Sequence, residues 1–270
     1  MTLPEPSSYV DLERYPILDL GTDAARELVS ACRRQLAADG CCELPGFLRP
    51  EATELMVKES EDLVAVSHHA RGPITAYLEI PDANWPEGHP RRSFGLSSLA
   101  AIAYDRFPHE HALRRLYEWD GLVRFLEAAL GVPRLHRYAD PMSALNVAVM
   151  KEGDELWWHF DQCDFVTSIA LRDASEGGDF EYAPNVRSAD DERYDVVKAL
   201  LDGSREHVKH VPMTPGTLLL FRGRNSIHRV TPCHGAVPRL VALLAYDEKA
   251  DVLGTDLLRM ARYGRTIAPR

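Results

Sequence analysis

The sequence predicts a mainly β protein with helices, in which an antiparallel double sheet or jelly roll follows a helical region. From residue 134 onward, short runs of β-branched and aromatic residues are separated by turn-forming residues. Their connections are too short for the crossovers that parallel strands require. Before Pro133, apolar residues recur at helical spacing instead. We therefore expect residues 1–133 to form a helical support and lid, and residues 134–270 to form the β core of one integrated domain.

The support region is predicted to contain mostly helices. Gly40 stands just beyond the first helix, and Pro50 opens the second because its missing N–H would be unpaired in the first turn anyway. The predicted helices cover residues 23–38, 50–69, 109–119 and 120–130, and extended pieces cover residues 15–20 and 41–48. Residues 71–95 are rich in Pro and longer than a plain connection needs, which predicts a lid or binding loop.

The core is predicted to contain strands at residues 134–139, 144–150, 156–160 and 165–171. A Gly177-Gly178 turn then leads into another strand, an amphipathic helical insertion covers residues 190–201, and an edge strand lies near residues 206–210. A Pro215-Gly216 turn starts a buried apolar strand, and His228 stands on the strand that returns.

Composition limits the class of protein. The chain has 270 residues, 45% of them hydrophobic, which is enough for a full core. A net charge of −10 argues against binding to nucleic acid, which requires a basic surface. Neither a signal sequence nor an apolar run of membrane-spanning length is present, so we expect a cytoplasmic protein without a membrane partner. Five cysteines without C-x-x-C spacing indicate reduced thiols, Cys163 being one that could line a site.

A metal site is indicated by His159-x-Asp161. In a strand, alternate side chains share a face, so His159 and Asp161 project the same way. With His228 from a distant strand they form two histidines and one carboxylate, the set that holds non-haem Fe(II) and leaves positions open. An isolated H-x-D is weak evidence, and the sequence that follows strengthens it. Arg239 begins the apolar run 240–245, where a guanidinium is costly to desolvate unless an anion meets it.

These motifs together resemble the Fe(II)/2-oxoglutarate-dependent oxygenase superfamily. The similar features lie between about residues 134 and 247: His159-x-Asp161, Gly177-Gly178-x-Phe180, residues 215–221, residues 228–230 and Arg239. The resemblance implies a double-stranded β-helix, or cupin-like jelly roll, as the core. It also implies Fe(II) on His159, Asp161 and His228, 2-oxoglutarate held at its distal carboxylate by Arg239, and O₂ as co-substrate. Residues 157–165 and 177–182 are similar to bacterial enzymes that chlorinate or hydroxylate free amino acids such as lysine.

Two positions depart from the family pattern. Many members carry Ser or Thr two residues after the co-substrate arginine, where this chain has Val241, so another group must help Arg239 or the arginine acts alone. Halogenating members replace the carboxylate ligand by a small residue that leaves room for chloride. Asp161 is intact, and hydroxylation is therefore the expected outcome.

The residues that contact the substrate are less defined. Arg92, Trp158, Asp164 and Arg222 are candidates for the substrate, and Asn146 for the co-substrate. Alternatively, the arginines lie on the solvated surface, and Asn146 is a core residue whose side-chain amide has its hydrogen bonds satisfied within the protein. Asp164 or Glu181 could meet a substrate amine, and one of Trp157 and Trp158 could border the pocket while the other packs in the core.

The predicted function is hydroxylation of an unactivated C–H bond in a small free amino acid or amino-acid-derived molecule, with release of succinate and CO₂. A homodimer is a further possibility. One alternative is a 2-oxoglutarate-dependent hydroxylase of a protein or peptide side chain. Another is a metal-binding jelly roll without enzymatic activity.

Overall fold

The computed structural model describes residues 3–268, so the outermost residues of the two predicted regions, 1–2 and 269–270, lie outside the description. The helices are α1 (Asp23–Asp39), α2 (Pro50–Leu63), α3 (Ala112–Tyr117), α4 (Asp120–Leu130), α5 (Tyr194–Leu201) and α6 (Asp256–Tyr263). The first strands are β1 (Cys41–Leu44), β2 (His68–Thr75), β3 (Phe94–Ala103), β4 (His136–Arg137), β5 (Leu145–Met150), β6 (Glu155–His159), β7 (Val166–Arg172) and β8 (Glu176–Gly177). The remaining strands are β9 (Phe180–Ala183), β10 (Lys209–Val211), β11 (Leu218–Phe221), β12 (Ile227–Val230), β13 (Cys233–His234), β14 (Arg239–Leu244) and β15 (Tyr246–Asp247).

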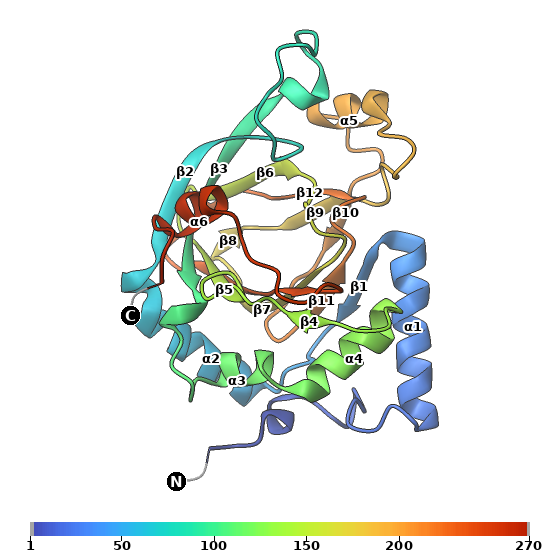
Figure 1. The fold of residues 1–270 in the computed structure, drawn as a ribbon, viewed down its shortest axis with the longest axis vertical. Helices are drawn as coiled ribbons and strands as arrows, with labels where there is room; N and C mark the ends of the chain where they lie inside the picture. Colours follow the sequence, from blue (N-terminus) through green and yellow to red (C-terminus); the bar gives the residue numbers. More distant parts are fainter. Residues whose placement is uncertain (1–2, 269–270) are drawn as a thin grey trace.

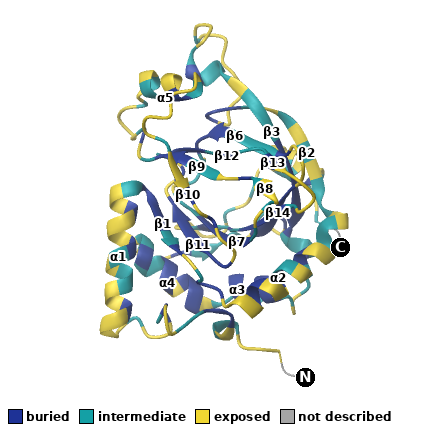
Figure 2. Cartoon of the chain, turned by 180° about the vertical axis from the view of Figure 1, so that it is seen from behind, coloured by how far each residue is buried: buried dark blue, intermediate teal, exposed yellow. Residues whose placement is uncertain are grey.

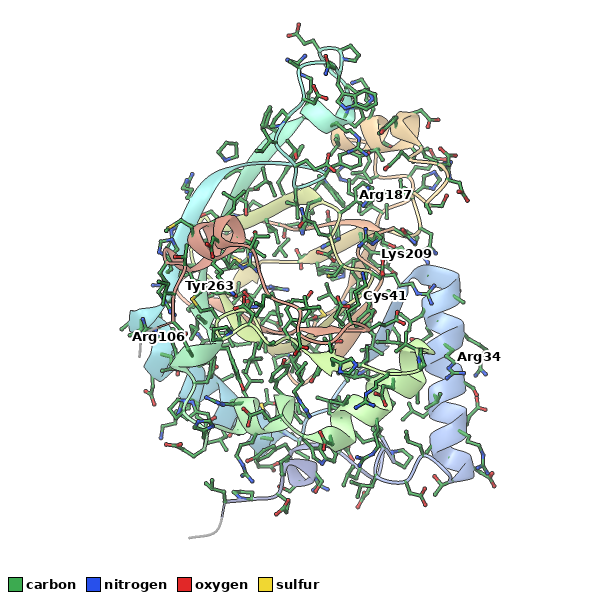
Figure 3. All side chains as sticks on the ribbon, in the orientation of Figure 1. Arg34, Cys41, Arg106, Arg187, Lys209 and Tyr263 are labelled. Carbon is green, nitrogen blue, oxygen red and sulfur yellow. The ribbon has the colours of Figure 1, made fainter. Side chains whose placement is uncertain are left out.

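One antiparallel sheet dominates the molecule. Its strands follow the order β1-β11-β7-β14-β5-β3-β6-β12-β9-β10, with β2 paired to β3 as a branch (Figure 1). The sheet curls until its two ends approach each other, and Figure 3 shows Lys209 of β10 near Cys41 of β1. Lys209 forms an ion pair at 2.5 Å with Asp39, the last residue of α1, two positions before β1. The predicted antiparallel jelly roll, a double-stranded β-helix, is therefore confirmed.

The two faces of the sheet have different roles. On β5, Leu145, Val147 and Val149 join the main apolar core, which α1 to α4 cover. Asn146, Ala148 and Met150 alternate with these residues and face the inside of the barrel instead. Figure 2 shows this division as buried strands beneath helices whose outer sides are exposed. The helices thus stabilise the sheet from outside and leave its inner face for other groups.

The first helix forms as predicted, with identifiable ends. The Thr22 side chain accepts a hydrogen bond from the Ala25 N–H, and Gly40 ends the helix with a φ of 64°, a left-handed value that glycine adopts without strain. Residues 15–20 are not a strand, however. They form an irregular segment whose apolar side chains, Tyr15 and Ile17, are buried in the main core. Burial without strand pairing explains the apolar run that suggested a strand.

The predicted loop at residues 71–95 is correct only in its centre. β2 and β3 pair from His68 with Ala101 to Thr75 with Phe94, so the irregular part covers residues 76–93. β3 also pairs with β5 and β6 and is thus part of the barrel wall. The helix predicted to run to about residue 69 ends at Leu63, before a short 3₁₀ turn. Strands from the expected support region therefore complete the core sheet.

A second, smaller cover lies outside β6, β9 and β12. Here α5 packs over Trp158 and Phe160 in an apolar cluster of its own. The loop 76–93 reaches the same place, because Arg91 forms ion pairs with Glu79 at 2.5 Å and Glu192 at 3.0 Å. Within residues 3–268, no helix is long and apolar enough to cross a lipid bilayer. All five cysteines are free, and all but Cys163 are buried.

Candidate metal and co-substrate site

The three predicted metal ligands meet at one point inside the barrel. His159 ends β6 and stands opposite His228 of β12 in the strand register, while Asp161 follows β6 by two residues. Asp161 Oδ1 lies 3.9 Å from His159 Nε2 and 3.6 Å from His228 Nε2. One ligand atom from each residue lies within 4.8 Å of the other two, a spacing at which all three can coordinate a single ion.

The orientation of both imidazoles is fixed by the backbone. His159 Nδ1 lies 2.8 Å from the Trp157 carbonyl oxygen, and His228 Nδ1 lies 3.0 Å from that of Ser226. A carbonyl only accepts hydrogen bonds, so each Nδ1–H donates and each Nε2 presents its lone pair to the cluster. Burial lowers the pKa of His159 to about 3 and that of His228 to about 4, and both rings are neutral near pH 7.

The surroundings of the Asp161 carboxylate fit a metal ligand better than a structural acceptor. Its Oδ2 is buried without a hydrogen-bond partner in the described part of the chain, and burial raises its pKa. Gly223 lies against it: a Cβ atom there would be 1.6 Å from Asp161 Oδ2. Only glycine fits at this position. The sequence alone does not reveal this role of Gly223, because it depends on Asp161, a neighbour far away in the chain.

Arg239 fits the co-substrate. Its side chain is buried on the inner face of β14 opposite Met150, whose sulfur is its one hydrogen-bond partner among the described residues, at 3.9 Å. Burial lowers the pKa of Arg239, although Asp173 and Asp179 oppose this from beyond ion-pair distance. Within residues 3–268, no protein carboxylate therefore serves as the anion expected beside Arg239. A buried guanidinium without such a partner is suited to bind a carboxylate of a ligand such as 2-oxoglutarate.

The double glycine after β7 makes room for this arginine. A Cβ at Gly178 would lie 2.9 Å from Arg239 Cδ and 3.0 Å from Cys233 Sγ, and one at Gly177 would lie 2.1 Å from the Pro232 carbonyl oxygen. Both glycines have positive φ values, 67° and 70°. The Gly177-Gly178 motif therefore allows β8 and β13 to pair directly beside Arg239.

The comparisons with known proteins agree with this geometry. Residues 24–257 match the sequence family described as Halogenase D. The chain belongs to the Halogenase D family. The family is one of enzymes by its description, which agrees with the prediction of an enzyme. A comparison with curated protein sequences finds no match.

Solved structures of similar fold include two that are described with 2-oxoglutarate and a prolyl hydroxylase. The epimerase SnoN of nogalamycin biosynthesis has 17% identity and a TM-score of 0.56, covering 82% of this chain and 83% of SnoN. HygX from Streptomyces hygroscopicus, with nickel, 2-oxoglutarate and hygromycin B bound, has 15% identity and a TM-score of 0.55, covering 80% and 86%. A Trichoplax adhaerens prolyl hydroxylase with a peptide fragment has 15% identity and a TM-score of 0.54, covering 82% and 89%. The resemblance to the superfamily is confirmed at the level of fold.

Asn146 of this Halogenase D family member also faces the barrel interior. It lies on β5, four residues before the Met150 that stands opposite Arg239. Its Oδ1 is buried and has no hydrogen-bond partner in residues 3–268. An amide with an unused acceptor fits a ligand-binding role better than the alternative of a satisfied core amide.

The four substrate candidates lie in separate surroundings. Arg92 donates to the Trp85 carbonyl oxygen at 2.8 Å within the loop, Arg222 is exposed, and Asp164 forms an exposed ion pair with Arg224. Trp158 is buried beneath α5, with Arg229 over its ring at 4.9 Å. The structure does not bring these four side chains together.

The expected alternation of Trp157 and Trp158 is interrupted by a bulge. Leu156 and His159 of β6 pair with Val230 and His228 of β12, so β6 carries one residue more than its partner between these pairs. Both tryptophans consequently pack against the cluster beneath α5. Glu181, considered as a partner for a substrate amine, already pairs with Arg229 at 2.7 Å.

Proposed function

We propose that this protein is an Fe(II)/2-oxoglutarate-dependent oxygenase that hydroxylates an unactivated C–H bond of a small amino-acid-like molecule. The observation that carries the proposal is the meeting of His159, Asp161 and His228 in a barrel that also holds the buried Arg239, which pairs with no carboxylate of residues 3–268. A ferrous ion with 2-oxoglutarate supplies the activation of O₂ and the oxidation of the C–H bond, with succinate and CO₂ as by-products.

The residues of the chain prepare the site for this chemistry. The two imidazoles and Asp161 would hold the ion on one side and leave the other side for ligands. Arg239, with Asn146 nearer the other end of β5, would fix the orientation of 2-oxoglutarate. Phe221 and Phe180 pack beside His228, with ring centroids 4.9 Å and 5.5 Å away, and exclude water from this side of the ligands.

Halogenation is the second candidate, because the family description names it. The ligand set favours hydroxylation. A halide would need the position that the Asp161 carboxylate takes, and Gly223 packs directly against that carboxylate. The side chain therefore has a site built around it, and we expect oxygen transfer and not chlorine transfer. Hydroxylation of a peptide side chain remains the other alternative within the same chemistry.

The test is an assay of the purified protein with Fe(II), 2-oxoglutarate and O₂ in chloride-containing buffer. The panel contains the common free amino acids and short peptides built from them. Succinate formation with a product one oxygen atom heavier is the expected result for at least one free amino acid. A chlorinated product would assign halogenation, and a peptide product would assign the peptide alternative. Absence of succinate across the panel would contradict the proposal. The predicted cytoplasmic location and homodimer stay predictions.

A further inference from the structure

Residues 184–193 connect β9 to α5 and include Arg187, which Figure 3 shows below α5. This segment is attached to the turn 222–226, which joins β11 to β12. The Arg187 N–H donates a hydrogen bond to the Asn225 carbonyl oxygen at 3.2 Å. The side chain of Arg187 is largely buried, with 14% of its surface exposed. The backbone thus brings a buried arginine directly beside this turn.

The guanidinium of Arg187 contacts the two segments that enclose the ligand Asp161. Its Cζ atom lies over the Phe160 ring, 4.1 Å from the centroid, and Phe160 directly precedes Asp161. Its Nε–H donates to the Arg224 carbonyl oxygen at 2.6 Å. Arg224 follows Gly223, whose carbonyl oxygen accepts a hydrogen bond from the Asp161 N–H at 3.0 Å. A single side chain therefore joins the end of β6 to the turn opposite it.

The position of the Asp161 carboxylate depends on the spacing of these two segments. A Cβ at Gly223 would lie 1.6 Å from Asp161 Oδ2, so a shift of the turn toward β6 would displace the carboxylate. Asp161 Oδ2 is buried without a hydrogen-bond partner among residues 3–268. No hydrogen bond within the described residues therefore holds Oδ2 in place, and the packing of the backbone around it does.

The junction between the two segments is closed on an exposed side and on a buried side. On the exposed side, the Arg224 side chain pairs with Asp164 and donates to the Gln162 carbonyl oxygen. Exposed ion pairs of this kind contribute little to stability, because water screens them. On the buried side, Arg187 combines a hydrogen bond with contact to an aromatic ring. We expect the buried side to set the spacing.

Arg91 provides a comparison within the same molecule. Both arginines pair with Glu192, Arg187 at 3.2 Å and Arg91 at 3.0 Å. Both lie over the Tyr77 ring, with Cζ 5.3 Å and 4.3 Å from the centroid, and their side chains are buried to a similar extent. In the described part of the chain, only Arg187 also reaches Phe160 and the turn after β11. The two residues therefore differ in their contact with the metal-binding segments.

We propose that Arg187 is a positioning residue of the metal site, which holds the Asp161 carboxylate in place by clamping Phe160 to the turn after β11. This inference rests on the proposed function and adds a residue that does not touch the ion itself. A planar guanidinium places one face on a ring while its N–H groups donate in its plane. A lysine ammonium is a compact donor without this flat face, so it replaces Arg187 only in part.

The alternative is that Arg187 only stabilises the cover beneath α5, together with Tyr77 and Glu192. In that case Arg187→Met and Arg91→Met would lower the free energy of unfolding by similar amounts. Metal binding by the folded protein would then be the same in both variants as in wild-type protein.

The experiment is a titration of metal-free protein with Co(II), followed by visible absorption, so no turnover is required. The absorption bands of Co(II) depend on the number and arrangement of its ligands. Arg187→Met keeps a side chain of similar length without its donors or charge. Its Co(II) affinity should fall roughly 10–100-fold, and its spectrum at saturation should differ from that of wild-type protein. Arg91→Met should keep the wild-type spectrum and an affinity within about threefold.

A second variant tests the role of the guanidinium. Arg187→Lys keeps the positive charge beside Glu192, and its Co(II) affinity should lie between those of wild-type protein and Arg187→Met. Circular dichroism and urea unfolding confirm that each variant is folded. If Arg187→Met does not fold, Arg187→Lys decides the question by its Co(II) affinity and spectrum.

The inference is overturned if the folded Arg187 variants keep the wild-type affinity and spectrum, or if Arg91→Met changes them equally. When wild-type protein binds Co(II) and the Arg187 variants behave like it, only this inference fails. When wild-type protein binds neither Co(II) nor Fe(II), the metal site and the proposed function fail, and the inference fails with them.

Discussion

The metal centre and the rim of the barrel are built in different ways. The centre uses residues from paired strands, His159 opposite His228 and Arg239 opposite Met150, where backbone hydrogen bonds set every position. The rim uses the loop 76–93 and α6, which are fixed by side-chain ion pairs from Arg91, Arg259 and Arg265. If the proposed function holds, the centre constrains the chemistry, and we expect the more variable rim to choose the substrate.

The largest effect should come from removing a ligand of the centre. His159→Ala leaves two ligands and should abolish binding of Fe(II), measured by equilibrium dialysis with iron analysis. His207→Ala is the control, because His207 is an exposed histidine outside the barrel. Iron affinity in His159→Ala equal to that of wild-type protein would disprove the ligand assignment.

The next largest effect should come from a residue that contacts a ligand without being one. Gly223→Ala places a methyl group on Asp161 Oδ2 and must displace the carboxylate. Loss of such support typically reduces metal affinity by roughly 10–100-fold. Gly72→Ala on β2 is the matched control, since no atom lies within 4 Å of the added Cβ. The Fe(II) affinity of Gly72→Ala in the same dialysis assay should equal that of wild-type protein. Equal Fe(II) affinities of Gly223→Ala and Gly72→Ala would contradict the proposed role of Gly223.

These two predictions show what the sequence could and could not reveal. His159 and Asp161 were predictable because strand alternation is local, and Arg239 because a charge beside an apolar run is visible in the sequence. Gly223 was not, because its need for glycine comes from Asp161 across the barrel. β3 was missed for a similar reason: small residues such as Ser97, Ser98 and Ala100 show no strand pattern by themselves, and pairing with β5 and β6 decides their conformation.

The rim can be tested without touching the centre. Arg91→Gln removes the ion pairs to Glu79 and Glu192 and the hydrogen bond to Tyr194 at 2.9 Å. The loop 76–93 should then exchange its amide hydrogens faster, while Fe(II) affinity stays within about threefold. Arg92→Gln is the adjacent control, because within residues 3–268 the Arg92 side chain donates a hydrogen bond only to the Trp85 carbonyl oxygen. A large loss of Fe(II) affinity in Arg91→Gln, together with faster amide exchange in the loop, would show that the centre and the rim are not independent.

The smallest effect concerns pH in the metal-free protein. His228 has a pKa of about 4 in the folded chain, below the ordinary value of 6.5 that applies after unfolding. Between pH 6.5 and 4 the unfolded chain therefore binds a proton at this residue that the folded chain does not, and the stability contribution falls as pH falls. His228→Gln cannot take up this proton, so its free energy of unfolding in urea should decrease less than that of wild-type protein from pH 7 to pH 5. Equal decreases would mean that His228 is not held neutral by burial. Asp161, whose pKa is raised, contributes to the pH dependence in the opposite direction. Both wild-type protein and His228→Gln contain Asp161, so its contribution does not account for a difference between them.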